Sequence, residues 1–130
     1  MISGILITGG YPISNFRSVE LFSPGIMNQT CLLPDLPDSR LWHTSDGTAS
    51  GVFICGGLGG SASTSCITIS GGQWIQSHSL LYPRYGHVSF PVRDGIILMG
   101  GWYNNSSFTS EMVKFNGKVK KTFTLKYKTL

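Results

Sequence analysis

Two stretches of the chain follow one pattern, RLWHTSDGTASGVFICGG at residues 40–57 and RYGHVSFPVRDGIILMGG at residues 84–101. Each begins with Arg-x-x-His and ends with an apolar run and Gly-Gly, and the offset between the arginines is 44 positions (84 − 40). A third diglycine, Gly9-Gly10, lies 47 positions before Gly56-Gly57 (56 − 9). A period in the forties marked by Gly-Gly is typical of stacked supersecondary units. The pattern therefore predicts a repeat fold.

The composition is that of a turn-rich β protein. Of the 130 residues, 41 % are apolar and only 12 % are charged, and 17 are glycine, whereas about 25 % charged residues is usual. No window has the apolar spacing of an amphipathic helix. No apolar run approaches the roughly 20 residues that span a bilayer, so we expect one all-β domain and no membrane insertion.

The net charge of +4 comes from lysines near the C-terminus. A basic tail can bind nucleic acid or anionic lipid, but phosphate binding also favours arginine forks and aromatic platforms, which this tail lacks. We expect these lysines to protect an exposed edge strand, and we predict no nucleic-acid partner. The lysines are Lys114, Lys118, Lys120, Lys121, Lys126 and Lys128.

The middle unit is expected to form four strands joined by tight turns. Residues 51–55 are a continuous apolar run, as in a strand buried on both faces, and Gly56-Gly57 ends it. Asp46-Gly47 is a hairpin signal before this run, and Gly71-Gly72 is the turn before the last strand. The predicted strands are residues 41–45, 51–55, 65–69 and 73–77.

The flanking units repeat this order. In the last unit, strands are predicted over residues 86–92, 96–99, 111–115 and 122–125. The first unit lacks its opening strand and is predicted to use residues 4–8, 19–22 and 27–33. The chain then divides into a partial unit (1–36), a full unit (37–80) and a full unit with the start of the next (81–130).

These recurring elements resemble the kelch repeat. The resemblance rests on Arg-x-x-His, the apolar strand ending in Gly-Gly, the third strand with Glu20 or Glu111, and Trp74 in the last strand. It implies an incomplete kelch-type β-propeller, with about two and a half to three four-stranded antiparallel blades. Two features depart from the repeat: Ile67 replaces the glutamate, and Trp74 has no aromatic counterpart in the other units.

We expect the recurring residues to have structural roles. Glycines allow tight turns beside a neighbouring unit, and the arginines and histidines are expected to hydrogen-bond turn carbonyls or the next unit. A catalytic or metal-binding role is disfavoured because such residues are rarely duplicated in every repeat. The predicted structural residues are Gly9, Gly10, Arg40, His43, Gly56, Gly57, Trp74, Arg84, His87, Gly100 and Gly101.

No catalytic motif stands out, so we predict a non-catalytic protein without cofactor or metal. The resemblance implies a protein-interaction module in which the loops after the diglycines contact a protein partner. The best contact candidates are aromatic, because aromatic side chains dominate binding hot spots; the alternative is that they pack on adjacent loops. These candidates are Trp102, Tyr103, Phe108 and Tyr11.

A secreted carbohydrate-binding or galactose-oxidase-like propeller is the alternative function. Three glycosylation sequons, beginning at Asn28, Asn104 and Asn105, and an odd number of cysteines favour it without deciding the compartment. Cys55 and Cys66 fall on neighbouring predicted strands, where a disulfide is possible. Small buried apolar side chains are the other interpretation of the cysteines.

The repeats are too few to close a propeller, which takes about four to eight blades. A ring of two chains would lack an innermost strand at each joint, because the next Arg-x-x-His would fall at positions 128 and 131 (84 + 44 and 87 + 44), whereas the chain ends at Leu130. We therefore expect a segment of a longer propeller, accompanied by further blades of the same full-length chain.

Overall fold

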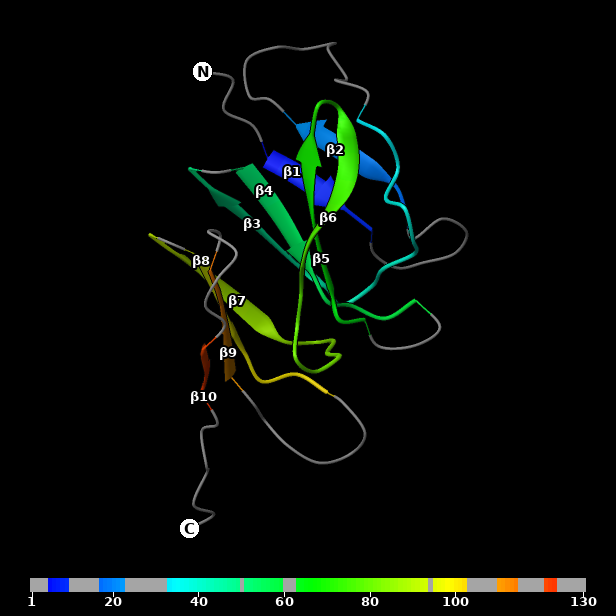
Figure 1. Cartoon of the computed structure of the whole chain (residues 1–130). Coiled ribbons are helices and arrows are strands. Elements are labelled where there is room, and N and C mark those ends of the chain that lie inside the picture. The colour runs from blue at the N-terminus through cyan, green and yellow to red at the C-terminus, as the bar shows by residue number, and fades with distance from the viewer. Residues whose placement is uncertain are drawn as a thin grey trace.

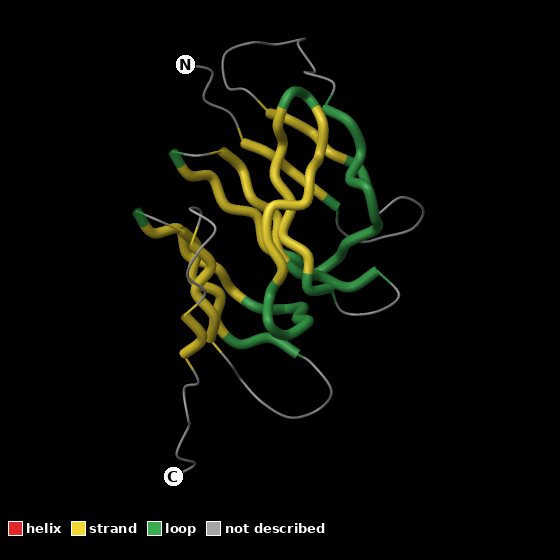
Figure 2. Tube along the Cα trace, viewed as in Figure 1, coloured by secondary structure: helices red, strands yellow, loops and turns green. Residues whose placement is uncertain are grey.

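The computed structural model describes residues 5–9, 17–22, 33–49, 51–59, 63–93, 95–102, 110–114 and 121–123. Within these ranges the protein is all-β, with antiparallel strands and no helix (Figures 1 and 2). The strands form one two-stranded sheet and two four-stranded sheets. The strands that precede the three diglycines therefore lie in three separate sheets, as the repeat pattern predicts.

Each sheet takes its strands from consecutive parts of the chain. The first sheet pairs β1 with β2, the middle sheet has the order β3-β4-β5-β6, and the third has the order β10-β9-β8-β7. The strands are β1 (Ile5–Thr8), β2 (Val19–Phe22), β3 (Thr44–Thr48), β4 (Gly51–Cys55), β5 (Ser65–Ser70), β6 (Gln73–Ser79), β7 (Val88–Val92), β8 (Gly95–Met99), β9 (Ser110–Lys114) and β10 (Lys121–Phe123). The fourth strand predicted for the first unit, residues 27–33, lies mostly outside the described residues.

The turn between β5 and β6 is the glycine turn that the sequence predicts. Gly71 and Gly72 have φ angles of 57° and 78°, and the strands pair directly on either side, with Ser70 opposite Gln73. Two successive positive φ angles define the hairpin turn that matches the twist of antiparallel strands, and glycine adopts them without strain.

The predicted hairpin at Asp46-Gly47 is wrong. Both residues lie inside β3, where Asp46 pairs with Phe53 and Gly47 pairs with Val52, and the chain reverses only after Thr48. The strand is displaced because Trp42 has a φ of 55°, which no β-strand allows. The first strand therefore begins at Thr44 rather than at residue 41, and the third sheet likewise begins at Val88 rather than at residue 86.

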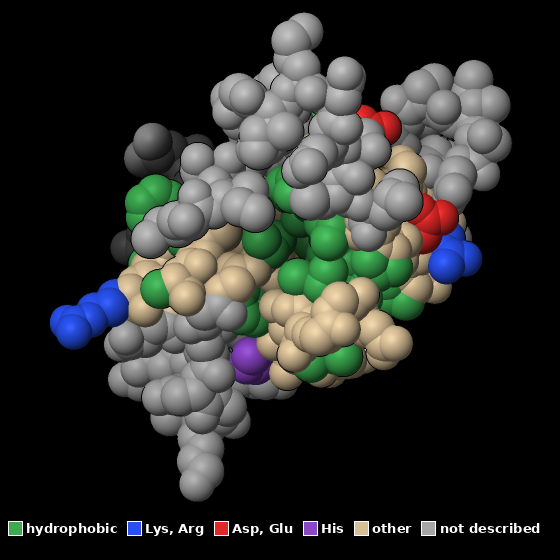
Figure 3. All heavy atoms as spheres, turned by 90° about the horizontal axis from the view of Figure 1, so that it is seen from above, with side chains coloured by type: hydrophobic (Ala, Val, Ile, Leu, Met, Phe, Trp, Pro, Cys, Tyr) green, Lys and Arg blue, Asp and Glu red, His purple; other side chains and the backbone are tan. Residues whose placement is uncertain are grey.

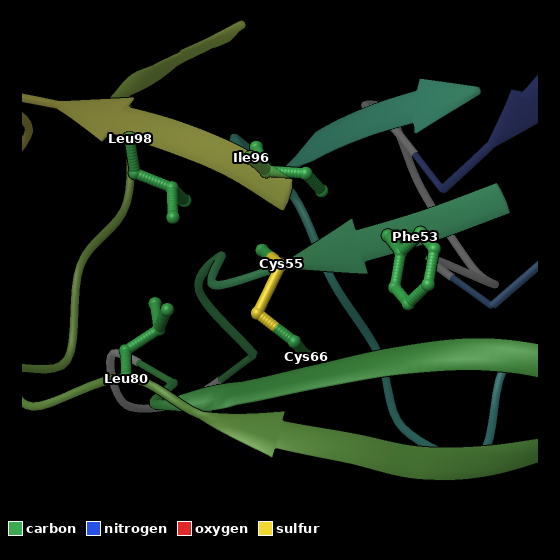
Figure 4. Packing of buried hydrophobic residues seen from close by; sticks show 6 residues of the cluster. All are labelled: Phe53, Cys55, Cys66, Leu80, Ile96 and Leu98. Atoms are coloured by element: carbon green, nitrogen blue, oxygen red, sulfur yellow. A yellow bond between two sulfur atoms is a disulfide. The ribbon is translucent and has the colours of Figure 1, made fainter. Parts of the chain in front are cut away.

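Both faces of the central strands of the middle sheet, β4 and β5, are buried. One face contributes Phe53 and Cys55 of β4, which cluster with Ile96 and Leu98 of β8 (Figure 4). The opposite face contributes Ile54 and Ile67 to a second cluster, against which Val19 of β2 and Trp74 of β6 pack. In the view of Figure 3, apolar side chains form a central patch, and the Lys, Arg, Asp and Glu side chains lie at the margins. The core is therefore divided into layers between stacked sheets.

A disulfide joins the middle strands of this sheet. Cys55 and Cys66 are directly opposite in the register of β4 and β5, both are buried, and their sulfur atoms are bonded. The bond closes the loop that follows Gly56-Gly57. It resolves the choice that the sequence leaves open for these two cysteines, and Cys31 lies outside the described residues.

In the third sheet, the side chains of β7 and β8 are buried on one face only, whereas the sequence predicts residues 96–99 as the counterpart of the buried strand at residues 51–55. Ile96 and Leu98 are buried against the middle sheet, whereas Met99 is 40 % exposed. On β7, Val88 and Phe90 are also exposed. The apolar run of β4 is buried on both faces, whereas the corresponding run in β8 has one exposed face.

Candidate functional site: an aromatic surface at the junction of two repeats

Arg40 organises the junction from the middle repeat. Its side chain is buried, and Nη1 donates hydrogen bonds to the carbonyl oxygens of Gly56 (3.0 Å) and Ser65 (2.9 Å). Nη2 also contacts the hydroxyl of Ser65. Nε and Nη2 donate to the two carboxylate oxygens of Asp38, at 2.8 and 3.1 Å. The guanidinium thus ties the start of the repeat to the end of β4 and the start of β5.

Arg84 repeats part of this arrangement one period later. It is also buried, and its Nη1 donates to the carbonyl oxygen of Gly100 at 3.0 Å. Each arginine therefore bonds the first glycine of its own diglycine, which is the hydrogen bonding to turn carbonyls expected from the sequence. Tyr82 stands where the middle repeat has Asp38 (82 − 44), so the aspartate at that position is not repeated.

The diglycines are needed because two repeats approach closely there. A Cβ added to Gly56 would lie 2.6 Å from the carbonyl oxygen of Arg84 and 2.7 Å from Cε1 of His87, both in the next repeat. A Cβ added to Gly57 would lie 2.9 Å from Cβ of His43, and the amide of Gly57 donates to the carbonyl of Arg84 at 2.8 Å. The first glycine thus accommodates the following repeat, and the second accommodates its own histidine.

The two histidines bridge neighbouring sheets. Nε2 of His43 is hydrogen-bonded to Oγ1 of Thr8 at 2.7 Å, and Nε2 of His87 is hydrogen-bonded to Oγ1 of Thr44 at 2.9 Å. Burial, and secondly the charge of Arg40, lowers the pKa of His43. Burial, followed by the charges of Arg84 and His43, lowers the pKa of His87 to about 4. Both rings are neutral at pH 7 and act as links between sheets.

This pKa shift predicts loss of stability in mild acid. The unfolded chain binds a proton at His87 near pH 6.5, whereas the folded chain binds it only near pH 4. The contribution of neutral His87 to the free energy of unfolding is therefore fully present above pH 6.5 and is lost as the pH falls toward 4. We expect a loss of about 2 kcal/mol by pH 5, measured by urea denaturation. His87→Gln should be less stable at pH 7.5 and should have a flatter pH profile; an unchanged profile would contradict the role of His87.

Three aromatic side chains meet around Gly86, and we call them the aromatic surface: Trp42, Tyr85 and Trp102. The rings of Trp42 and Tyr85 are stacked with centroids 5.7 Å apart. Tyr85 and Trp102 form a backbone bridge, and the amide of Gly86 donates to the carbonyl of Trp42 at 2.8 Å. A Cβ on Gly86 would lie 3.4 Å from the Trp102 ring. Both tryptophans are exposed, at 59 % and 60 %.

The backbone of Trp42 is held in an unfavourable conformation. Trp42 and Gly86 occupy the same position in their repeats (86 − 44), and their φ angles are 55° and 62°. Glycine adopts this conformation freely, whereas a side chain costs about 1 kcal/mol or more. A large exposed aromatic residue at a site suited to glycine is an outlier of the kind that points to function.

One of the four predicted contact residues belongs to this surface. Trp102 is placed there, whereas Tyr11, Tyr103 and Phe108 lie outside the described residues. Sequence reasoning missed Trp42 and Tyr85, although both occupy the variable positions of Arg-x-x-His, where an aromatic residue serves no evident purpose in the repeat. Trp74 has a packing role, and its Nε1 donates to the carbonyl of Pro34 at 2.7 Å.

In the described part of the chain, no three His, Cys, Asp or Glu side chains are grouped so that they could hold a metal ion. None of its elements is a helix of the length and hydropathy needed to cross a bilayer. Comparison of the sequence with known protein families and with curated proteins gives no match.

Proposed function

We propose that the protein is a non-catalytic protein-interaction module, built on a kelch-type propeller scaffold, that binds a protein partner through the aromatic surface. The observation that carries the proposal is the pair of exposed tryptophans that both contact Gly86 at one repeat junction. Tryptophan and tyrosine supply large contact areas at low entropic cost and are enriched in binding hot spots.

The scaffold part of the proposal is supported by the packing of the repeats. Antiparallel sheets follow one another along the chain. Arg40 and Arg84 each bond the first glycine of their own diglycine, and His43 and His87 each bond a threonine of the preceding sheet. In a kelch-type propeller such sheets are the blades, and the segments beside the diglycines lie at one end of the structure. The aromatic surface is made by these segments.

Partner binding is tested by replacing each of the two exposed tryptophans with a small residue. Trp42→Gly introduces the residue found at the equivalent position, and Trp102→Ser removes the other exposed ring. We expect each variant to weaken capture of the partner about 30-fold, as for a hot-spot loss of about 2 kcal/mol, with a thermal melt that is not lowered. Ile75→Ser, at another exposed apolar residue, on β6, is the matched control.

Affinity capture with the unmodified chain and with each variant compares the proteins that they retain. Quantitative mass spectrometry measures the amount of each retained protein. A protein retained by the unmodified chain and by Ile75→Ser but lost from both tryptophan variants supports the proposal. Equal retention by all four chains contradicts it. If the tryptophan variants melt at a lower temperature, the rings serve packing instead.

Carbohydrate binding is the second candidate function. The Cys55–Cys66 disulfide favours it, because disulfides persist in secreted proteins. Titration of tryptophan fluorescence with mono- and oligosaccharides distinguishes the two functions: a saturable change lost in Trp42→Gly would assign the surface to a sugar ligand.

A further inference from the structure

The disulfide of the middle sheet closes a loop that holds the start of the third repeat. Cys55 and Cys66 are 11 positions apart in the sequence. In the described part of the loop between them, the amide of Gly57 donates to the carbonyl of Arg84 at 2.8 Å, and the carbonyl of Ser63 accepts from the amide of Arg84 at 3.2 Å. The loop therefore binds both backbone groups of Arg84.

The same loop is connected to the aromatic surface. The amide of Leu80 donates to the carbonyl of Thr64 at 2.6 Å, so the segment that leads into the third repeat is bound to the loop before Arg84 as well. Arg84 is followed directly by Tyr85, whose ring stacks on that of Trp42. The disulfide-closed loop thus fixes the backbone next to the aromatic surface.

The third sheet covers the sulfur atoms of this disulfide. Cys55 and Cys66 are 1 % and 0 % exposed, and they share a buried cluster with Ile96 and Leu98 of β8 (Figure 4). Thiol–disulfide exchange requires a thiolate to reach one of the two sulfur atoms. A reductant can therefore attack this bond only after the third sheet has moved away from the middle one.

We propose that the Cys55–Cys66 disulfide is a redox switch for the aromatic surface, opened by a dithiol reductant. In two exchange steps the S–S bond breaks, the two cysteines take up two electrons and two protons as thiols, and the two thiols of the reductant are oxidised to a disulfide. The loop is then no longer closed covalently, its bonds to Arg84 weaken, and Trp42 and Tyr85 are held together less tightly. The switch rests on the proposed function only for its effect on partner binding.

Linkage makes this switch work in both directions. If reduction loosens the contact between the middle and third sheets, a change that loosens this contact must favour reduction. Ile96 and Ile54 provide the comparison, because both are buried, at 1 % and 0 % exposed, and they lie on different faces of the middle sheet. Ile96 packs in the cluster of the disulfide, whereas Ile54 belongs to the cluster against which Val19 of β2 packs.

The first test measures the rate at which dithiothreitol, a dithiol, reduces the folded chain. Alkylation with N-ethylmaleimide at successive times, followed by mass spectrometry of the peptides that contain Cys55 and Cys66, gives the reduced fraction. We expect Ile96→Val to accelerate reduction about fivefold and Ile54→Val to accelerate it less than about twofold, although each removes one buried methylene group.

Two results of this test would overturn the switch. Equal acceleration by Ile96→Val and Ile54→Val would mean that reduction passes through unfolding of the whole chain. Reduction of the folded chain as fast as that of the chain in urea would mean that the sulfur atoms are accessible without movement of the third sheet.

The second test compares amide hydrogen exchange in the oxidised and reduced chains. The amides of Gly57 and Gly86 donate across the junction, to the carbonyls of Arg84 and Trp42. We expect both to exchange at least about tenfold faster after reduction, because a cross-link over a loop of this size commonly contributes more than that factor to stability. Amides between β7 and β8 should be unaffected. Unchanged exchange at both glycines, or equal acceleration between β7 and β8, would contradict the switch.

Partner capture gives a readout that separates the switch from the proposed function. With the reductant removed under nitrogen before capture, a protein retained by the oxidised chain should be lost from the reduced chain, and equal retention by both forms overturns the switch. If neither form retains a protein, the proposed function fails, and the reduction rates and amide exchange still decide the switch.

Discussion

Arg40→Met is expected to lower the free energy of unfolding by about 3 kcal/mol or more. The methionine keeps much of the apolar stem but removes the donors that serve the carbonyl oxygens of Gly56 and Ser65. A buried acceptor left without its donor costs about 1–3 kcal/mol, and bonds to a charged donor are at the strong end of the range. The bond to Asp38 adds little, since its side chain is 54 % exposed.

Urea denaturation followed by tryptophan fluorescence or circular dichroism measures this loss. Arg93→Met, at an exposed arginine in the turn after β7, is the matched control and should change stability by less than about 0.5 kcal/mol. Equal effects of the two substitutions would mean that Arg40 is not a structural centre of the repeat.

Gly56→Ala is expected to be as damaging, for a steric reason. The added Cβ would lie 2.6 Å from a backbone oxygen and 2.7 Å from the ring of His87, so the third sheet would have to move away from the middle one. Overpacking of this kind costs about 1–3 kcal/mol, and the φ of +65° adds about 1 kcal/mol for any residue with a side chain.

Gly71→Ala separates these two contributions. Gly71 has a similar φ of +57°, but a Cβ there would have nothing within 4 Å. We expect Gly71→Ala to lose only the conformational part, about 1 kcal/mol, and Gly56→Ala to lose about 2 kcal/mol more in the same urea titration. If both alanines cost the same, close approach of the repeats is not what requires glycine at position 56.

Strands with a strong local signal are predictable from this sequence. The apolar run at residues 51–55 and the alternating run at 65–69 end at glycines, and the structure places β4 and β5 there with at most one residue of difference. Gly71-Gly72 is a turn for the same reason, because two adjacent glycines favour positive φ at both positions.

The errors occur where contacts between repeats override local preference. Asp46-Gly47 has the composition of a turn, yet pairing with β4 keeps both residues in a strand. Trp42 has no local preference for a positive φ. The amide of Gly86, which belongs to the next repeat, donates a hydrogen bond to the carbonyl of Trp42 and holds the backbone of Trp42 in this conformation. No short-range pattern contains that information.

The aromatic surface was predicted only in part, for a similar reason. Trp102 follows a diglycine, where the resemblance places partner-binding loops, so the sequence predicts it. Trp42 and Tyr85 come from the motif to which a structural role was assigned, and they meet only because two repeats are in register. The open side of β8 was missed as well, since an apolar run does not reveal how many of its faces are covered.

The central claim is that the repeats form separate sheets stacked face to face, and nuclear Overhauser contacts in the isotope-labelled chain test it most directly. We expect contacts between the methyl group of Thr44 and the ring of His87, and between side chains of Phe53 or Cys55 and those of Ile96 or Leu98. Backbone contacts should run from β4 to β3 and β5, and from β8 to β7 and β9. Cross-strand backbone contacts between β4 and β8 would place both in one sheet and contradict the claim.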